Sequence, residues 1–115
     1  MSTTKPRLNN QDIVSLLEHA TVLLAGEDIQ PANAQQLVGY YTIILFRFRD
    51  GDDTTTRALL PFASGDRKKV GQKCGFLVSL GLLEQSLQAT AANRQENAYG
   101  PPPALIKSLR ARERS

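Results

Sequence analysis

The feature that most constrains this chain is a short cationic, amphipathic segment between Gly65 and Gly81. Apolar side chains recur there at helical spacing, while residues 67–73 carry four basic residues and no acidic one. The apolar positions are Val70, Cys74, Leu77 and Leu80, and the basic ones are Arg67, Lys68, Lys69 and Lys73. The pattern predicts a helix over residues 67–80 with one face in a core and positive charge on the other. A helix of this kind fits the major groove of DNA.

Length and composition indicate one small domain. With 115 residues, of which 41% are apolar and 22% charged, the chain has enough apolar side chains for one modest core. We expect a loose segment at residues 1–9, a single folded domain over residues 10–112 and a loose tail at residues 113–115. No apolar run reaches the roughly 18 residues of a membrane span, and the start lacks an apolar signal sequence. A cytoplasmic, nucleoid-associated protein with no membrane partner is therefore expected.

The net charge of +3 is small, but it is unevenly distributed. Residues 12–28 carry four acidic residues and no Lys or Arg, whereas residues 67–73 and 107–114 are mainly basic. This distribution indicates an oriented molecule with nucleic acid on one side. The alternative is that these segments are ordinary solvated helix faces.

Two helices are expected before the cationic segment. The first runs from about Gln11 to Ala25, with Asn9 or Asn10 as its cap and Gly26 as its end. The second runs over residues 31–49, begins with a proline and ends at Asp50-Gly51. A β-hairpin is the alternative for residues 40–60, because YYTIILFRFR is rich in β-branched and aromatic residues and DGDD suits a turn.

The remaining elements follow from caps, breakers and alternation. A short third helix is expected from the threonines at 54–56 to Ala63, although Pro61 is unfavourable inside it. Residues 83–89 and 95–99 are expected to form two antiparallel strands around a small polar tip. Gly100 and three prolines then end the pattern, and a last helix is expected over residues 104–112.

This order of elements resembles the winged helix-turn-helix class, most closely its small bacterial and archaeal transcription regulators. The resemblance covers about residues 31–99. It is carried by Thr55 or Thr56, Leu59, the Ser64-Gly65-Asp66 turn, Val70, Leu77 and the Gly81-Leu82-Leu83-Glu84 end. It implies a mainly α fold with a small β-wing (α+β), with additional N- and C-terminal helices. Those leucine-rich helices either pack on the domain or form a two-fold interface.

The resemblance implies that the helix at residues 66–80 and the wing at residues 84–99 contact DNA. The implied DNA-binding residues are Thr55, Thr56, Ser64, Arg67, Lys68, Lys69, Gln72, Lys73 and Arg94. Arginine and glutamine make bidentate contacts to guanine and adenine, lysine neutralises phosphate, and hydroxyls bind phosphate at helix starts. Gly71 and Gly75 indicate either close approach to a partner or a helix whose packing tolerates small residues.

No catalytic, metal or cofactor site is expected. His19 is the only histidine and Cys74 the only cysteine, so the chain lacks metal-ligand spacing and any intrachain disulfide. A phosphate loop is also absent. Asp50, Asp52 and Asp53 are interpreted as a turn and cap cluster, and Cys74 as a buried apolar residue.

The sequence therefore predicts a dimeric DNA-binding protein, not an enzyme, whose partner is double-stranded DNA and whose role is transcription regulation. A plasmid or viral segregation or replication factor is a second interpretation of the DNA-binding fold. A winged-helix adaptor that binds another protein is the main alternative. A regulator that binds RNA or polymerase is a weaker one.

Overall fold

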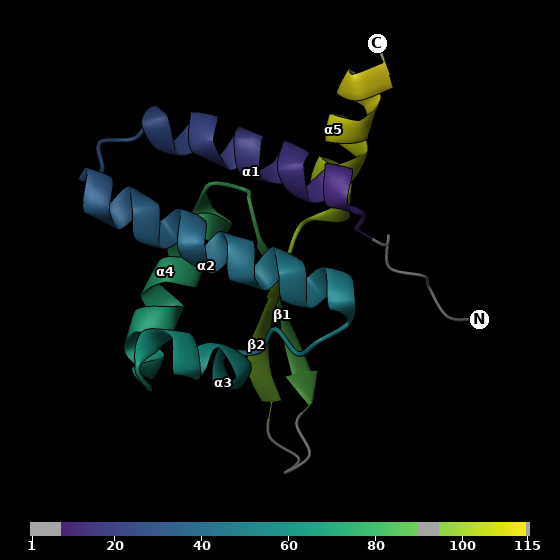
Figure 1. Cartoon of the computed structure of the whole chain (residues 1–115). Helices are drawn as coiled ribbons and strands as arrows, with labels where there is room; N and C mark the ends of the chain where they lie inside the picture. Colours follow the sequence, from purple (N-terminus) through teal and green to yellow (C-terminus); the bar gives the residue numbers. More distant parts are fainter. Residues whose placement is uncertain (1–7, 90–94, 115) are drawn as a thin grey trace.

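The computed structural model describes residues 8–89 and 95–114. It is mainly helical and has one small antiparallel sheet (Figure 1). The elements in chain order are α1 (Asn10–Ala25), α2 (Pro31–Asp50), α3 (Thr56–Leu59), the 3₁₀ helix η1 (Leu60–Ala63), α4 (Arg67–Ser79), β1 (Glu84–Ala89), β2 (Gln95–Gly100) and α5 (Pro103–Arg114).

Helix α1 begins with a reciprocal cap. The Asn9 side chain accepts a hydrogen bond from the Asp12 backbone N–H at 2.8 Å, and the Asp12 carboxylate accepts one from the Asn9 N–H at 2.9 Å. The predicted cap at Asn9 is confirmed. Leu8 is buried beside it, so the last two residues of the expected loose N-terminal segment belong to the folded part of the chain. Residues 1–7 lie outside the described part.

Residues 31–50 form one helix, so the hairpin alternative for residues 40–60 is wrong. Pro31 occupies the first turn, and Gly51 ends α2 in the left-handed conformation at φ 77°. Tyr41, Ile44 and Leu45 are fully buried, and α2 packs against both α1 and α4. This packing on two sides outweighs the strand preference of the β-branched and aromatic residues. Burying the apolar side of the helix stabilises it by more free energy than the local strand preference costs.

The third helical segment spans the expected residues but changes type part-way. Helix α3 ends at Leu59, and η1 continues to Ala63 with Pro61 in its first turn. Proline lacks the N–H that a continuing α-helix needs, whereas it is tolerated at the start of a new helical segment. The expected cost of Pro61 is thereby avoided.

The sheet is a hairpin with a third, minimal contribution from the segment before α3. β1 pairs with β2 from Glu84↔Gly100 to Ala89↔Gln95. On the other side of β2, Thr55 forms an isolated antiparallel bridge with Ala98, and the Tyr99 N–H donates to the Thr54 carbonyl at 3.2 Å. The tip of the predicted wing, residues 90–94, lies outside the described residues.

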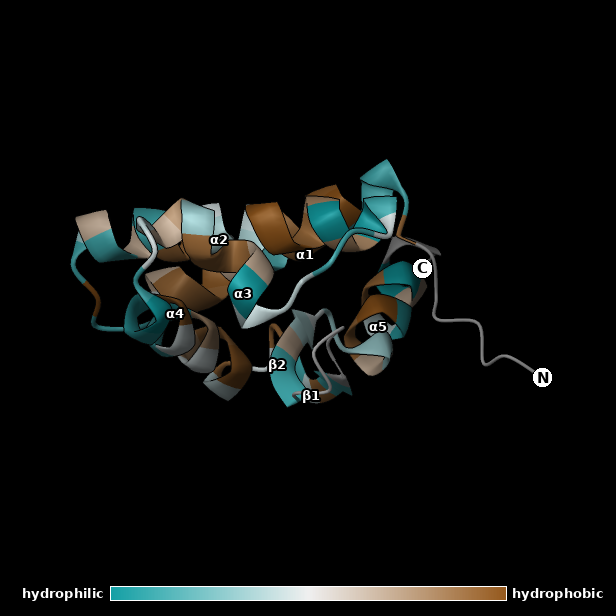
Figure 2. Cartoon of the chain, turned by 90° about the horizontal axis from the view of Figure 1, so that it is seen from below, coloured by the Kyte–Doolittle hydropathy of each residue, from teal (hydrophilic) through white to brown (hydrophobic). Residues whose placement is uncertain are grey.

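The two flanking helices pack on the same core as the rest of the domain. Leu16 and Leu24 of α1 and Ile106 and Leu109 of α5 are buried and belong to one apolar cluster with the buried faces of α2 and α4. Figure 2 shows apolar segments along α1, α2 and α4, and α2 packs against each of the other two helices. Of the two alternatives for these helices, packing on the domain accounts for their apolar faces. Helix α5 extends to Arg114, beyond the expected end at residue 112.

Candidate nucleic-acid interface

Helix α4 is positioned by the turn before it, by its N-terminal cap and by its buried face. The turn before it uses positive φ at Ser64 (54°) and Gly65 (80°), and the Asp66 side chain then accepts the Lys69 N–H at 3.1 Å. Val70, Cys74 and Leu77 are fully buried. Burial raises the pKa of the Cys74 thiol to about 12, so it is a neutral packing residue, as predicted.

The opposite face of α4 is open to solvent and bears no acidic group. Lys68, Gly71, Gln72, Gly75 and Ser79 are all exposed, and their spacing places them on one side of the helix. The helix from Arg67 to Ser79 contains no Asp or Glu. This side combines a cation and an amide with two glycines, and the exposed side chain of Phe76, one turn after Gln72, borders it.

The two glycines face this surface rather than the core. A methyl group placed on Gly71 or Gly75 would meet no heavy atom within 4 Å. Packing within the chain therefore does not explain why small residues stand there. Both interpretations of the glycines therefore stay predictions: close approach of a partner along this side of α4, or a helix that tolerates small residues.

Lys69 and Lys73 border the open face. Both are half-buried, in contrast with exposed Lys68. Lysine stems commonly lie along apolar surface while the ammonium group stays in water. Lys68 therefore lies on the open face of α4, and Lys69 and Lys73 lie together along one flank of it.

Arg67 is held by an ion pair to the sheet. Its Nη1 lies 2.8 Å from Oε1 of Glu96 on β2, and the Glu96 side chain is mostly buried. The other carboxylate oxygen of Glu96 is buried and has no hydrogen-bond partner in the described part of the chain. This contact connects the start of α4 to the sheet and offsets one of the four basic charges.

The structure places the two predicted threonines inside the domain. Thr55 caps α3 through a 3.3 Å hydrogen bond from the Ala58 N–H, and the Thr56 hydroxyl lies 3.5 Å from the Asn97 carbonyl. Both are buried, Thr55 with 2% of its surface exposed. Their hydroxyls satisfy internal backbone groups, so they lie away from the open face of α4. Ser64 is exposed in the turn.

The strands of the hairpin carry no positive charge. Within β1 and β2 the charged residues are Glu84 and Glu96, both acidic. The expected contact of the wing with DNA depends on Arg94, which lies outside the described residues. The described part of the hairpin therefore adds nothing to the cationic surface of α4.

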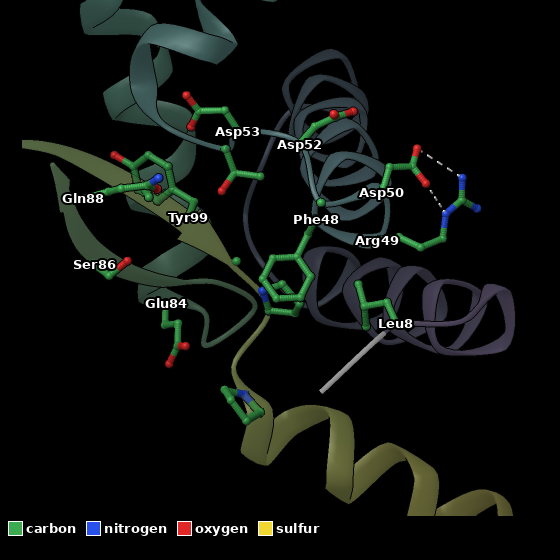
Figure 3. A pocket seen from close by; sticks show the side chains of 16 residues that line it. Leu8, Phe48, Arg49, Asp50, Asp52, Asp53, Glu84, Ser86, Gln88 and Tyr99 are labelled. Carbon is green, nitrogen blue, oxygen red and sulfur yellow. Dashed lines mark hydrogen bonds and ion pairs between the residues drawn. The ribbon is translucent and has the colours of Figure 1, made fainter. Parts of the chain in front are cut away.

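A polar groove that was not expected from the sequence lies beside the sheet, with a volume of about 820 Å³. Figure 3 shows Asp50 at the end of α2, Asp52 and Asp53 on the segment that follows it, and Glu84, Ser86 and Gln88 on β1. Asp50 pairs with Arg49 at 2.9 Å, and Asp53 accepts the Thr55 N–H at 2.9 Å. These two contacts agree with the predicted turn and cap cluster.

Within the described residues, no group of three or more His, Cys, Asp or Glu side chains has the arrangement of a metal site. No helix in residues 8–89 or 95–114 is both long enough and apolar enough to span a bilayer.

No protein-family model, curated protein or solved structure matches this chain.

Proposed function

We propose that this chain is a DNA-binding protein of winged helix-turn-helix type that inserts α4 into the major groove. The observation that carries the proposal is the open face of α4, where Lys68 and Gln72 stand beside exposed Gly71 and Gly75 without a carboxylate. A helix of this shape fits the groove, and its small residues allow a close approach to the phosphate backbone.

The arrangement of the other elements supports the same proposal. The order α2, bridge segment, α3, turn, α4, β1, β2 corresponds to that of a winged helix. The Thr55↔Ala98 bridge lies at the end of the short connection between α2 and α3, where the expected order has an extended residue pair. Helix α3 with η1 and α4 are then the two helices of the helix-turn-helix.

Gln72 and the three lysines of α4 have distinct parts in this proposal. Gln72 has both a donor and an acceptor and matches an adenine edge. Lys68, Lys69 and Lys73 neutralise phosphates and position the helix. The protein acts by occupying its site, as a transcription regulator does, and performs no chemistry.

The proposal is tested by fluorescence anisotropy with random and genomic-fragment duplexes at two salt concentrations. Lys68→Glu is compared with Lys107→Glu, which makes the same charge change at an exposed position of α5. We expect Lys68→Glu to weaken binding by at least tenfold and Lys107→Glu by less than threefold, as contact charges dominate salt-dependent affinity.

A second variant separates base recognition from phosphate contact. Gln72→Ala is expected to reduce the preference for one duplex over another while the salt dependence stays unchanged. Equal effects of the two lysine variants, or no binding at low salt by protein with native circular dichroism, would refute the proposal. The winged-helix adaptor would then be the function to test, by capture of a protein partner.

A further inference from the structure

The hairpin has one covered edge and one open edge. The far side of β2 is covered by the Thr54–Thr55 segment through the bridge and hydrogen bond described above. Among the described residues, no segment pairs with the outer side of β1 (Figure 1). The outer edge of β1 therefore presents backbone N–H and C=O groups that are free to pair with another strand.

β1 lacks the devices by which edge strands usually avoid such pairing. Its sequence, Glu84 to Ala89, contains no lysine and no proline, and its pairing with β2 is continuous, without a bulge. Its only charge is at its first residue. Leu87, near its middle, has 64% of its surface exposed although it is a large apolar residue. Such an edge accepts a further strand.

We propose that the outer edge of β1 pairs antiparallel with the same edge of a second copy, about a two-fold axis through Leu87. In this register Leu87 faces Leu87 of the partner subunit, and Gln85 and Ser86 face alanine and glutamine. Any neighbouring register would instead place Leu87 opposite glutamine, serine or the small Ala89. The axis through Leu87 therefore buries the most apolar surface.

The charges of β1 suit a second copy rather than DNA. A two-fold contact must be self-complementary, so like charges must not meet across it. With the axis at Leu87, the two Glu84 residues lie about 20 Å apart along the strands, given roughly 3.4 Å per residue. The strands carry Glu84 and Glu96 and no cation, so phosphate is repelled. This dimer contact is separate from DNA binding and is measured without DNA.

Disulfide cross-linking tests the register directly. Facing Cα atoms in an antiparallel pair lie about 4.5–5.5 Å apart, within the range of a disulfide. We expect Leu87→Cys to form a covalent dimer on mild oxidation. In Gln85→Cys the two cysteines would lie about 14 Å apart and should cross-link at least tenfold more slowly. Cys74 is buried, so the wild type serves as the unreactive background.

Sedimentation equilibrium tests the association itself. We expect the wild type to show twice its chain mass of 12.6 kDa and Leu87→Lys to show a single chain mass with unchanged circular dichroism. Val22→Lys is the matched control, because Val22 on α1 is 71% exposed and lies outside the sheet; it should remain dimeric. A monomeric wild type at about 0.1 mM, a dimeric Leu87→Lys, or equal cross-linking rates would overturn the proposal.

Discussion

Arg110 of α5 holds Asp12 of α1 in a two-point ion pair, with Nη2 at 2.6 Å from Oδ2 and Nε at 2.9 Å from Oδ1. The same carboxylate also accepts the Asn9 N–H and so completes the cap of α1. Asp12 has only 6% of its surface exposed. One buried acidic group therefore both starts the first helix and anchors the last one.

Replacing this carboxylate should weaken the fold. Asp12→Asn keeps the shape of the side chain but removes the charge that Arg110 binds, and we expect a loss of about 1–3 kcal/mol in the free energy of unfolding. Urea unfolding followed by circular dichroism measures this loss. Asp50→Asn is the control, since the Arg49–Asp50 pair is exposed and its loss should cost less than about 0.5 kcal/mol. Equal losses in the two variants would show that the buried Asp12–Arg110 pair contributes no more to stability than the exposed Arg49–Asp50 pair.

The contribution of Asp12 should depend on pH. Hydrogen bonds from Arg110 hold the pKa of Asp12 below its ordinary 3.8, with further help from the Asn9 N–H and the charge of Arg110, although burial opposes the shift. Because the folded-state pKa is depressed, the stabilisation is present above the unfolded pKa and is lost as pH falls through the folded value. The wild type should therefore lose more stability than Asp12→Asn between about pH 5 and pH 2. Parallel pH curves for the two proteins would contradict this.

Replacing the exposed glycines of α4 with alanine should change stability and DNA affinity in opposite directions. Gly71→Ala with Gly75→Ala should raise the free energy of unfolding by about 0.4–1 kcal/mol per site, because alanine restricts the unfolded chain and meets no neighbour. DNA affinity should fall if the open face approaches the phosphate backbone. Gly81→Ala is the opposite control: its φ of 78° strains alanine, so stability should drop. A double variant that gains stability and keeps full affinity would show that the glycines do not serve DNA binding.

Glu96 should limit DNA affinity through Arg67. Under the proposed function, Glu96→Gln removes a negative charge beside α4 and releases Arg67 from its 2.8 Å ion pair. Affinity should rise several-fold, and the plot of log affinity against log salt should steepen by about one unit. Anisotropy titrations at several salt concentrations measure both. Glu18→Gln, at an exposed position of α1, is the charge-matched control and should change neither. A weaker Glu96→Gln complex would instead show that Glu96 positions Arg67.

The hydroxyl of Tyr41 should be dispensable. It is buried in α2 and has no hydrogen-bond partner among the described residues, and its burial raises the pKa of the phenol. Tyr41→Phe removes an unsatisfied polar atom, so we expect unfolding free energy to rise by about 1 kcal/mol. Tyr40→Phe is the comparison, because the Tyr40 hydroxyl reaches the Phe62 carbonyl at 3.5 Å and its removal should give no gain. Destabilisation by Tyr41→Phe would indicate a partner for this hydroxyl.

The limits of most elements could be predicted from the sequence. The Asn9 cap, Pro31 at the start of α2 and Gly51 at its end act through hydrogen bonds and backbone angles within a few residues. The same is true of the cationic helix after Gly65, whose buried stripe has the expected members Val70, Cys74 and Leu77. Such signals act within a few residues, so they can be recognised in the sequence without knowledge of the tertiary structure.

Other features were decided only by the tertiary structure. Residues 40–50 are helical because α1 and α4 cover them on two sides, although their local preference is ambiguous. Thr55 and Thr56 match the positions of phosphate-binding hydroxyls, yet their contact with β2 turns them inward.

The pairing of Asp12 with Arg110, the restraint of Arg67 by Glu96 and the open edge of β1 are also consequences of tertiary packing. The first two join residues that are far apart in sequence, 98 positions in one case and 29 in the other. Residue type and local spacing determine backbone angles and helical faces. Burial and ion pairing depend instead on which distant surfaces meet, and this is settled only when the whole core is assembled.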